Sequence, residues 1–148
     1  MSEKKLTLEF VMDEKFKIEG DANGHKIVID QPVNAGGTNA GPTPLDYLFA
    51  AHAGCLATVA RIIAMQKQLP LRGMKITISG DVNLNALLGK PSDDPVGFKG
   101  IFIMADIDGD MTLEQKEELL RLADKRCPVS YNLQHATPVK ISISGGVE

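Results

Sequence analysis

The sequence is poor in cysteine and has no concentration of positive charge. It holds two cysteines in 148 residues, too few for the disulfide framework of a small secreted protein or for a zinc site built from cysteines. Sixteen Lys and Arg stand against nineteen Asp and Glu without a basic cluster, so we expect no nucleic-acid partner. The first ten residues lack the apolar stretch of a signal peptide. We therefore expect a cytoplasmic protein whose thiols are kept reduced.

The balance of residue types is that of a folded globular protein. Hydrophobic residues make up 43% of the chain and charged residues 24%, and the length suits one domain, which we place over residues 1–148. One apolar stretch, residues 45–65, is long enough to be mistaken for a membrane span. It contains Asp46, His52 and Arg61, and such groups are costly inside a bilayer. We interpret it as a core helix and expect no membrane partner.

The first half of the chain predicts three strands followed by this helix. Apolar and polar residues alternate over the first thirty positions, with a turn at residues 21–24, which is typical of three antiparallel strands. A loop rich in Gly, Asn, Thr and Pro follows at residues 34–44. Thr43 can then cap a helix that reaches about Lys67, with Asp46 in the capping-box position. The helix is apolar on nearly every face, which indicates cover from a partner subunit.

The second half predicts two strands, two helices and a closing strand. Alternation returns at residues 74–83 and 97–107, and we expect the loop between them to be mobile. Thr112 and Gln115 form a capping box for an amphipathic helix. A short helix over residues 128–134 and a strand over residues 139–144 complete the chain. The predicted order is βββ-α-ββ-α-(α)-β, an α+β fold.

The two cysteines differ in their local surroundings. Cys127 precedes Pro128, where the start of a short helix and the neighbouring Lys125 and Arg126 favour a thiolate. A cysteine in this position can equally be a cap or a small buried residue. Cys55 lies inside the apolar helix and, judged by spacing alone, belongs to the core. His52 is three residues before it on the same helical face and could orient a thiolate, although a buried structural histidine is the commoner case.

Two motifs with these cysteines resemble the OsmC/Ohr family of osmotically inducible and organic hydroperoxide resistance proteins. The first is PLDYLFAAHAGC at residues 44–55, preceded by GGTNAGP at residues 36–42, and the second is RCPVS at residues 126–130. The similarity covers most of the chain. The motif pattern is that of the OsmC-like branch with a Pro-x-acidic sequence, here Pro44, Leu45 and Asp46.

The resemblance implies an OsmC-like fold and an activity. The fold would be an intertwined homodimer in which two long apolar helices pack at the centre. The activity would be thiol-dependent reduction of organic hydroperoxides in an antioxidant, oxidative-stress role. By position, Cys55 would attack the peroxide and become a sulfenic acid, and Cys127 would resolve it as a disulfide. A small dithiol or lipoyl group would then restore both thiols, and no cofactor or metal is implied.

The sequence departs from the hydroperoxide reductases at the groups that activate the thiolate. In those proteins a Glu directly after the motif proline pairs with an Arg from the N-terminal strands, and together they hold the thiolate and orient the peroxide. Here the position of that Glu is Leu45, and no Arg precedes Arg61. Asp46 is the acidic residue available as a catalytic partner. The expected substrate pocket is apolar and suits an organic peroxide, with four lining residues: Leu45, Tyr47, Phe49 and His52. The alternative is a non-catalytic relative, a redox-responsive dimer or a dimer that binds a small apolar ligand.

Overall fold

The computed structural model describes residues 2–145 and divides them into two compact units. The first ends at Ala50 and the second begins at Ala51, within helix α1, Pro44–Gln66. Both units mix strands and helices or helical turns, which confirms the α+β class. A single domain over the whole chain stays a prediction.

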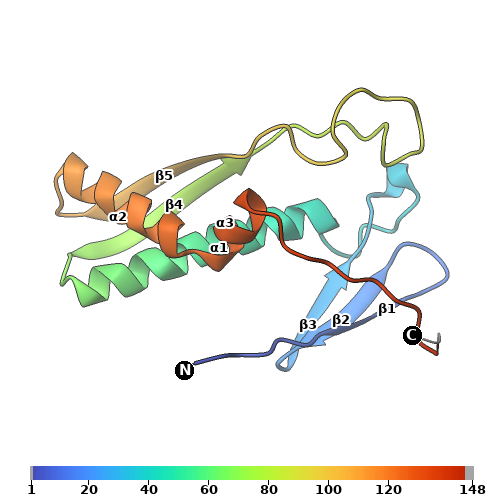
Figure 1. The fold of residues 1–148 in the computed structure, drawn as a ribbon, viewed down its shortest axis with the longest axis horizontal. Helices are drawn as coiled ribbons and strands as arrows, with labels where there is room; N and C mark the ends of the chain where they lie inside the picture. Colours follow the sequence, from blue (N-terminus) through green and yellow to red (C-terminus); the bar gives the residue numbers. More distant parts are fainter. Residues whose placement is uncertain (1, 146–148) are drawn as a thin grey trace. The chain divides into compact units, whose positions relative to one another are not determined.

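The first unit is built on a three-stranded antiparallel sheet. Its strands are β1, Glu9–Met12, β2, Ile18–Ala22, and β3, His25–Ile29, in the order β1-β2-β3 (Figure 1). The β2–β3 connection is the two-residue loop Asn23-Gly24, and both residues have positive φ, 54° and 85°. This is the conformation that the right-handed strand twist favours, and Asn-Gly adopts it at low cost. The predicted strands and turn are confirmed.

A buried carboxylate organises the loop that follows β3. Asp30 is 1% exposed and accepts hydrogen bonds from the backbone of Gln31, Thr38 and Ala40 at 2.8, 3.1 and 3.0 Å. The Thr38 hydroxyl donates a fourth at 2.6 Å. These bonds, the Thr38 hydroxyl first among them, hold the pKa of Asp30 far below its usual range. An ionised Asp30 therefore folds the loop back onto the end of β3.

The start of α1 is fixed by reciprocal hydrogen bonds. The Thr43 hydroxyl accepts the Asp46 N–H at 3.3 Å, and the Asp46 carboxylate accepts the Thr43 N–H and hydroxyl at 2.8 and 2.7 Å. This is the predicted capping box, with Asp in the place of Glu. The Tyr47 hydroxyl, one residue further on, donates to the Val28 carbonyl of β3 at 2.7 Å. Together they attach the first turn of α1 to its own unit.

The core of the second unit lies between α1, α2 and a two-stranded ribbon. The ribbon pairs β4, Leu71–Ser79, with β5, Phe102–Gly109, antiparallel, and α2 spans Leu113–Arg126 (Figure 1). The most deeply buried side chains come from all four elements and are Leu56, Ala60, Ile63 and Ala64 of α1, Leu71, Ile107, Leu119 and Ala123. Length and mean hydropathy of 1.7 would let α1 cross a membrane, but its buried residues form this core, as predicted.

Helices α2 and α3 meet at Cys127. Thr112 caps α2 with the predicted capping box to Gln115, and α3 spans Pro128–Gln134. Cys127 ends α2 and caps α3, because its sulfur accepts the Ser130 N–H at 3.3 Å. One stripe of α2 leads to it, since Leu119, Ala123 and Cys127 are four residues apart and each at most 1% exposed.

One segment has internal bonds that the sequence did not reveal, and another differs from the sequence-based expectation. In the loop after β4 the Asn83 amide donates to Asp94 at 2.7 Å, and Lys99 pairs with the same carboxylate at 2.9 Å, while the mobility of this loop stays a prediction. Residues 139–144, predicted as a strand, are not a strand in this structure. Val139, Ile141 and Ile143 keep the predicted alternation but are 77%, 93% and 87% exposed. A strand needs a neighbour for its backbone groups, and the described part of this single chain supplies none there.

Candidate functional site

The second unit brings the two cysteines together although 72 positions separate them in the sequence. Cys55 is half-buried on α1 and packs against the core, while Cys127 is 1% exposed at the α2–α3 junction. Both are free thiols, and they lie close enough for Cys55 to contribute to the pKa of the Cys127 thiol. A disulfide between them requires the sulfurs to approach to about 2.05 Å. The second unit thus brings the two predicted site cysteines to one place.

The surroundings of Cys127 keep it protonated. Burial raises the pKa of the Cys127 thiol above its ordinary value, and a negative charge on Cys55 raises it further. The N–H of Ser130 acts in the opposite direction, but burial outweighs it. Of the alternatives that the local sequence left open for Cys127, the structure favours the buried cap over the thiolate, because burial opposes charge on its sulfur. Cys127 is thus a thiol that holds its proton more tightly than an ordinary cysteine.

A small polar network that the sequence did not reveal fixes the Cys127 cap. Ser130 is 1% exposed, and its hydroxyl donates to the Asp124 carboxylate and accepts from the Gln134 amide at 2.7 Å. Asp124 precedes Cys127 on α2 and Gln134 ends α3, so Ser130 links both helices. The CPVS motif gave the only signal, since it places a serine three residues after the cysteine.

All four arginines of the chain bind groups elsewhere. The Arg61 guanidinium donates to the carbonyls of Leu71 and, at 3.0 Å, Arg72. Arg72 pairs with Asp108 and Asp110, Arg121 with Glu118, and Arg126 donates to Gln66 at 2.9 Å. The arginine that orients the peroxide in the hydroperoxide reductases thus has no counterpart among these four. Nor is any group of His, Cys, Asp and Glu in residues 2–145 arranged to hold a metal ion.

His52 stands out among the polar side chains of α1. It is 6% exposed, and neither ring nitrogen has a hydrogen-bond partner among the residues that the structure describes. Polar groups buried this far normally have partners, because an unsatisfied one costs free energy. His52 precedes Cys55 by three residues and so shares its helical face.

The other predicted site residues belong to the first unit. Asp46 is exposed, and both bonds from Thr43 reach its Oδ2 atom; these bonds lower the pKa of Asp46, so its carboxylate is ionised. Leu45 is 37% exposed, Tyr47 and Phe49 are partly buried, and the Tyr47 hydroxyl is bound to Val28. The catalytic role of Asp46 and the lining roles of these side chains stay predictions.

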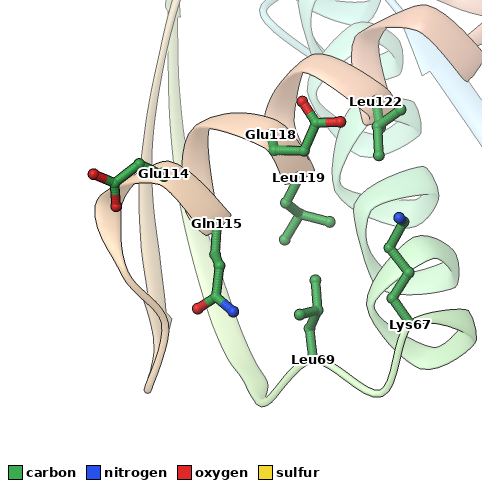
Figure 2. Close-up of a pocket in the computed structure, with 7 residues that line it drawn as sticks. All are labelled: Lys67, Leu69, Glu114, Gln115, Glu118, Leu119 and Leu122. Atoms are coloured by element: carbon green, nitrogen blue, oxygen red, sulfur yellow. The ribbon is translucent and has the colours of Figure 1, made fainter.

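One pocket of the second unit is remote from the thiols. It encloses about 270 Å³ between the end of α1 and the start of α2. In Figure 2, Leu69 and Leu119 point toward each other across it, whereas Glu114 points away. Lys67 at its rim is twelve residues after Cys55, which is about 18 Å along a helix. Neither cysteine lines it, so it is not the peroxide pocket expected from the sequence.

Comparison with known proteins gives consistent matches along the chain. Residues 37–142 match the model of the OsmC-like protein family. A hydroperoxide reductase of Mycoplasma genitalium is 26% identical over 142 residues, and the match covers 96% of both chains.

Solved structures of similar proteins share the fold. An OsmC-like protein from Mycoplasma pneumoniae superposes with a TM-score of 0.77 at 22% identity, covering 90% of this chain and 89% of the other. An organic hydroperoxide resistance protein OsmC from Legionella pneumophila gives 0.68 at 19%, covering 90% and 92%. Both motifs with the cysteines lie largely inside the matched range, 37–142.

Proposed function

Because the chain belongs to the OsmC-like protein family, we propose that it is a thiol-dependent peroxidase that reduces organic hydroperoxides. The observation that carries this proposal is the pair of neighbouring free thiols, Cys55 half-buried and Cys127 buried. Peroxide reduction by cysteine needs one thiolate that a peroxide can reach and one nearby thiol that closes a disulfide. The name of the Mycoplasma genitalium relative, hydroperoxide reductase, supports the same activity.

In the proposed reaction Cys55 attacks first. Its thiolate attacks the outer peroxide oxygen, the O–O bond breaks, and the products are a Cys55 sulfenic acid and an alkoxide, which takes up a proton to become the alcohol. The Cys127 sulfur then attacks the sulfenic sulfur, releasing water and forming a Cys55–Cys127 disulfide. A small dithiol or lipoyl group reduces this disulfide by exchange and becomes oxidised itself.

The surroundings of the two thiols support this order. Cys127 is almost fully covered and burial raises its pKa, so it is a poor first nucleophile. The Ser130 N–H holds the Cys127 sulfur at 3.3 Å, and Cys127 lies near enough to Cys55 for the two thiols to influence each other. A cytoplasmic location, where thiols are kept reduced, fits such a cycle. Asp46 stays the proposed acidic partner, and Leu45, Tyr47, Phe49 and His52 the proposed lining residues.

We also propose that the working form is a homodimer. In the second unit most exposed residues of α1 are small or apolar, namely Ala51, Gly54, Thr58, Ile62 and Met65, and the polar exceptions are Arg61 and Gln66. Ile62 and Met65 are 40% and 72% exposed, and the apolar residues of 139–144 also lack cover. A second copy of the chain would bury both surfaces, as expected for two such helices packed together. Light scattering after gel filtration should give twice the monomer mass of 15.9 kDa. The substitution Ile62→Glu should lower the measured mass toward that of the monomer.

The activity is tested by mixing reduced protein with cumene hydroperoxide. Both thiols should disappear rapidly with one peroxide consumed per chain, and a dithiol should sustain turnover. Cys55→Ser should abolish peroxide consumption, whereas Cys127→Ser should still consume one equivalent and stop at a sulfenic acid that dimedone traps. Slow oxidation that Cys55→Ser leaves unchanged, without turnover under dithiol, would refute the proposal.

One observation favours the alternative, a non-catalytic redox-responsive or ligand-binding dimer. All four arginines are bound elsewhere, so this chain lacks the cation that orients the peroxide in the hydroperoxide reductases. On that alternative, the Cys55–Cys127 disulfide would form and be reduced without catalytic peroxide consumption. An apolar ligand retained through purification, together with stoichiometric oxidation only, would distinguish it from the peroxidase.

A further inference from the structure

His52 is the buried polar group of the second unit that the structure leaves unexplained. It is 6% exposed, and neither Nδ1 nor Nε2 has a partner in residues 2–145. By contrast, the other buried polar side chains, Asp30 and Ser130, are each held by two or more hydrogen bonds. An imidazole kept in a buried position without a structural bond has its donor and acceptor available for another group.

The position of His52 relative to the thiols indicates which group that is. Residues three apart on a helix have Cβ atoms about 5–6 Å apart on one face. His52, Cys55 and Leu56 follow this spacing on the side of α1 that faces the core. Cys55 packs against that core, and Cys127 is near enough to Cys55 for the two thiols to influence each other. A peroxide attacked by Cys55 therefore reacts within reach of the imidazole.

The proposed reaction needs a proton donor beside Cys55. When the Cys55 thiolate attacks an alkyl hydroperoxide, the leaving group is a strongly basic alkoxide, which must be protonated as the O–O bond breaks. Cys127 holds its proton more tightly than an ordinary thiol, and all four guanidinium groups are bound elsewhere. Imidazole is the side chain that accepts and releases protons near neutral pH.

We propose that His52 is the proton donor for the peroxide step, an inference that rests on the peroxidase function above. The imidazole first accepts the proton of the Cys55 thiol, which leaves a thiolate beside an imidazolium. The thiolate then attacks the outer oxygen of the hydroperoxide and is oxidised by two electrons to the sulfenic acid. The O–O bond breaks, and the imidazolium gives its proton to the departing alkoxide, which becomes the alcohol. Neutral His52 remains, and no proton is taken from solvent.

The test compares two oxidants that differ in their need for a proton. Cumene hydroperoxide leaves as an alkoxide and requires one, whereas a peracid leaves as a carboxylate and does not. Stopped-flow rates of Cys55 oxidation are measured for both oxidants at one pH, for wild type and His52→Gln. Any change in the amount of Cys55 thiolate slows both reactions equally and cancels from their ratio. His25→Gln, at an exposed histidine of β3, is the matched control.

We expect His52→Gln to slow the reaction with cumene hydroperoxide by about 10²–10⁴-fold relative to the peracid, the usual contribution of a positioned general acid. His25→Gln should leave the ratio unchanged. Because His52 also accepts the Cys55 proton, the peracid rate itself falls with the amount of thiolate. A far-UV and near-UV circular dichroism spectrum of His52→Gln that matches the wild type shows that the variant is folded, so loss of structure cannot imitate the result. An unchanged ratio in His52→Gln overturns the role of His52 while the peroxidase function stands. A wild type that reacts with neither oxidant overturns both.

Discussion

Replacing Leu119 by Ala should slow disulfide formation by Cys127 more than peroxide attack by Cys55, because the Leu119 side chain supports the helix that carries Cys127. Leu119 is 1% exposed in the core of the second unit, two turns before Cys127 on the same buried stripe of α2. Removing a buried leucine side chain costs about 2–5 kcal/mol, through lost transfer free energy and the cavity left behind. Since nearly the whole side chain is covered, we expect Leu119→Ala to lower the free energy of unfolding by about 3 kcal/mol.

The size of the effect can be converted into a melting temperature. A chain of 148 residues has an unfolding entropy of about 0.3 kcal/mol per kelvin near its transition. A loss of about 3 kcal/mol therefore lowers the melting temperature by about 10 °C. Because the proposed dimer makes stability depend on concentration, all variants are compared at one protein concentration.

The same variant should slow disulfide formation more than peroxide attack. Loosening α2 displaces Cys127, which must meet the Cys55 sulfur, whereas Cys55 itself stays on α1. Single-turnover kinetics should therefore show an unchanged rate of sulfenic acid formation and a slower closure of the disulfide. Leu113→Ala is the matched control, since Leu113 lies on the same helix but is 68% exposed. Equal stability losses in the two variants, or equal slowing of both steps in Leu119→Ala, would refute this account of the core.

Two further predictions concern the carboxylates of the first unit. Asp46→Asn and Thr43→Ala both break the capping box, so the thermal stabilities of the two variants should fall by similar amounts. If Asp46 also acts in catalysis, Cys55 should be oxidised at least about tenfold more slowly in Asp46→Asn than in Thr43→Ala. Equal stopped-flow rates would show that Asp46 is a helix cap alone. The pKa of Asp30 is depressed in the folded protein, so its contribution to stability is present above the ordinary aspartate value of about 3.9 and is lost as the pH falls below it. Thermal melts between pH 7 and pH 3 should show a smaller acid loss in Asp30→Asn than in wild type, and parallel curves would contradict the role given to Asp30.

The elements fixed by neighbouring residues could be predicted from the sequence. The Asn23-Gly24 turn and the capping boxes at Thr43 and Thr112 each depend on residues at most three positions apart, and all are present. Their chemistry is local, because a side chain and a backbone group one turn away satisfy each other wherever the segment lies in the fold.

The features that depend on distant residues could not be predicted in this way. The buried Asp30 carboxylate accepts hydrogen bonds from backbone N–H groups eight and ten residues further on, and no pattern of residue types in the sequence indicates these donors. Apolar and polar residues alternate in the segment 139–144 as they do in a strand. This alternation shows which residues share a face, but it does not show which neighbouring strand would bind the backbone. The order of the loop after β4 likewise depends on Asn83 meeting Asp94 across eleven positions.

The proposed division of roles between the thiols rests on packing, and local electrostatics alone would reverse it. The start of α3 and two cationic neighbours favour charge on Cys127, yet the buried stripe of α2 places that sulfur where a charge has no water around it. Cys55, which local sequence assigns to the core, is the less covered of the two. A charge on Cys55 also raises the pKa of Cys127, so ionisation of one thiol opposes ionisation of the other. One sulfur can thus be the nucleophile while its neighbour remains a thiol, which is the state that the peroxide step requires.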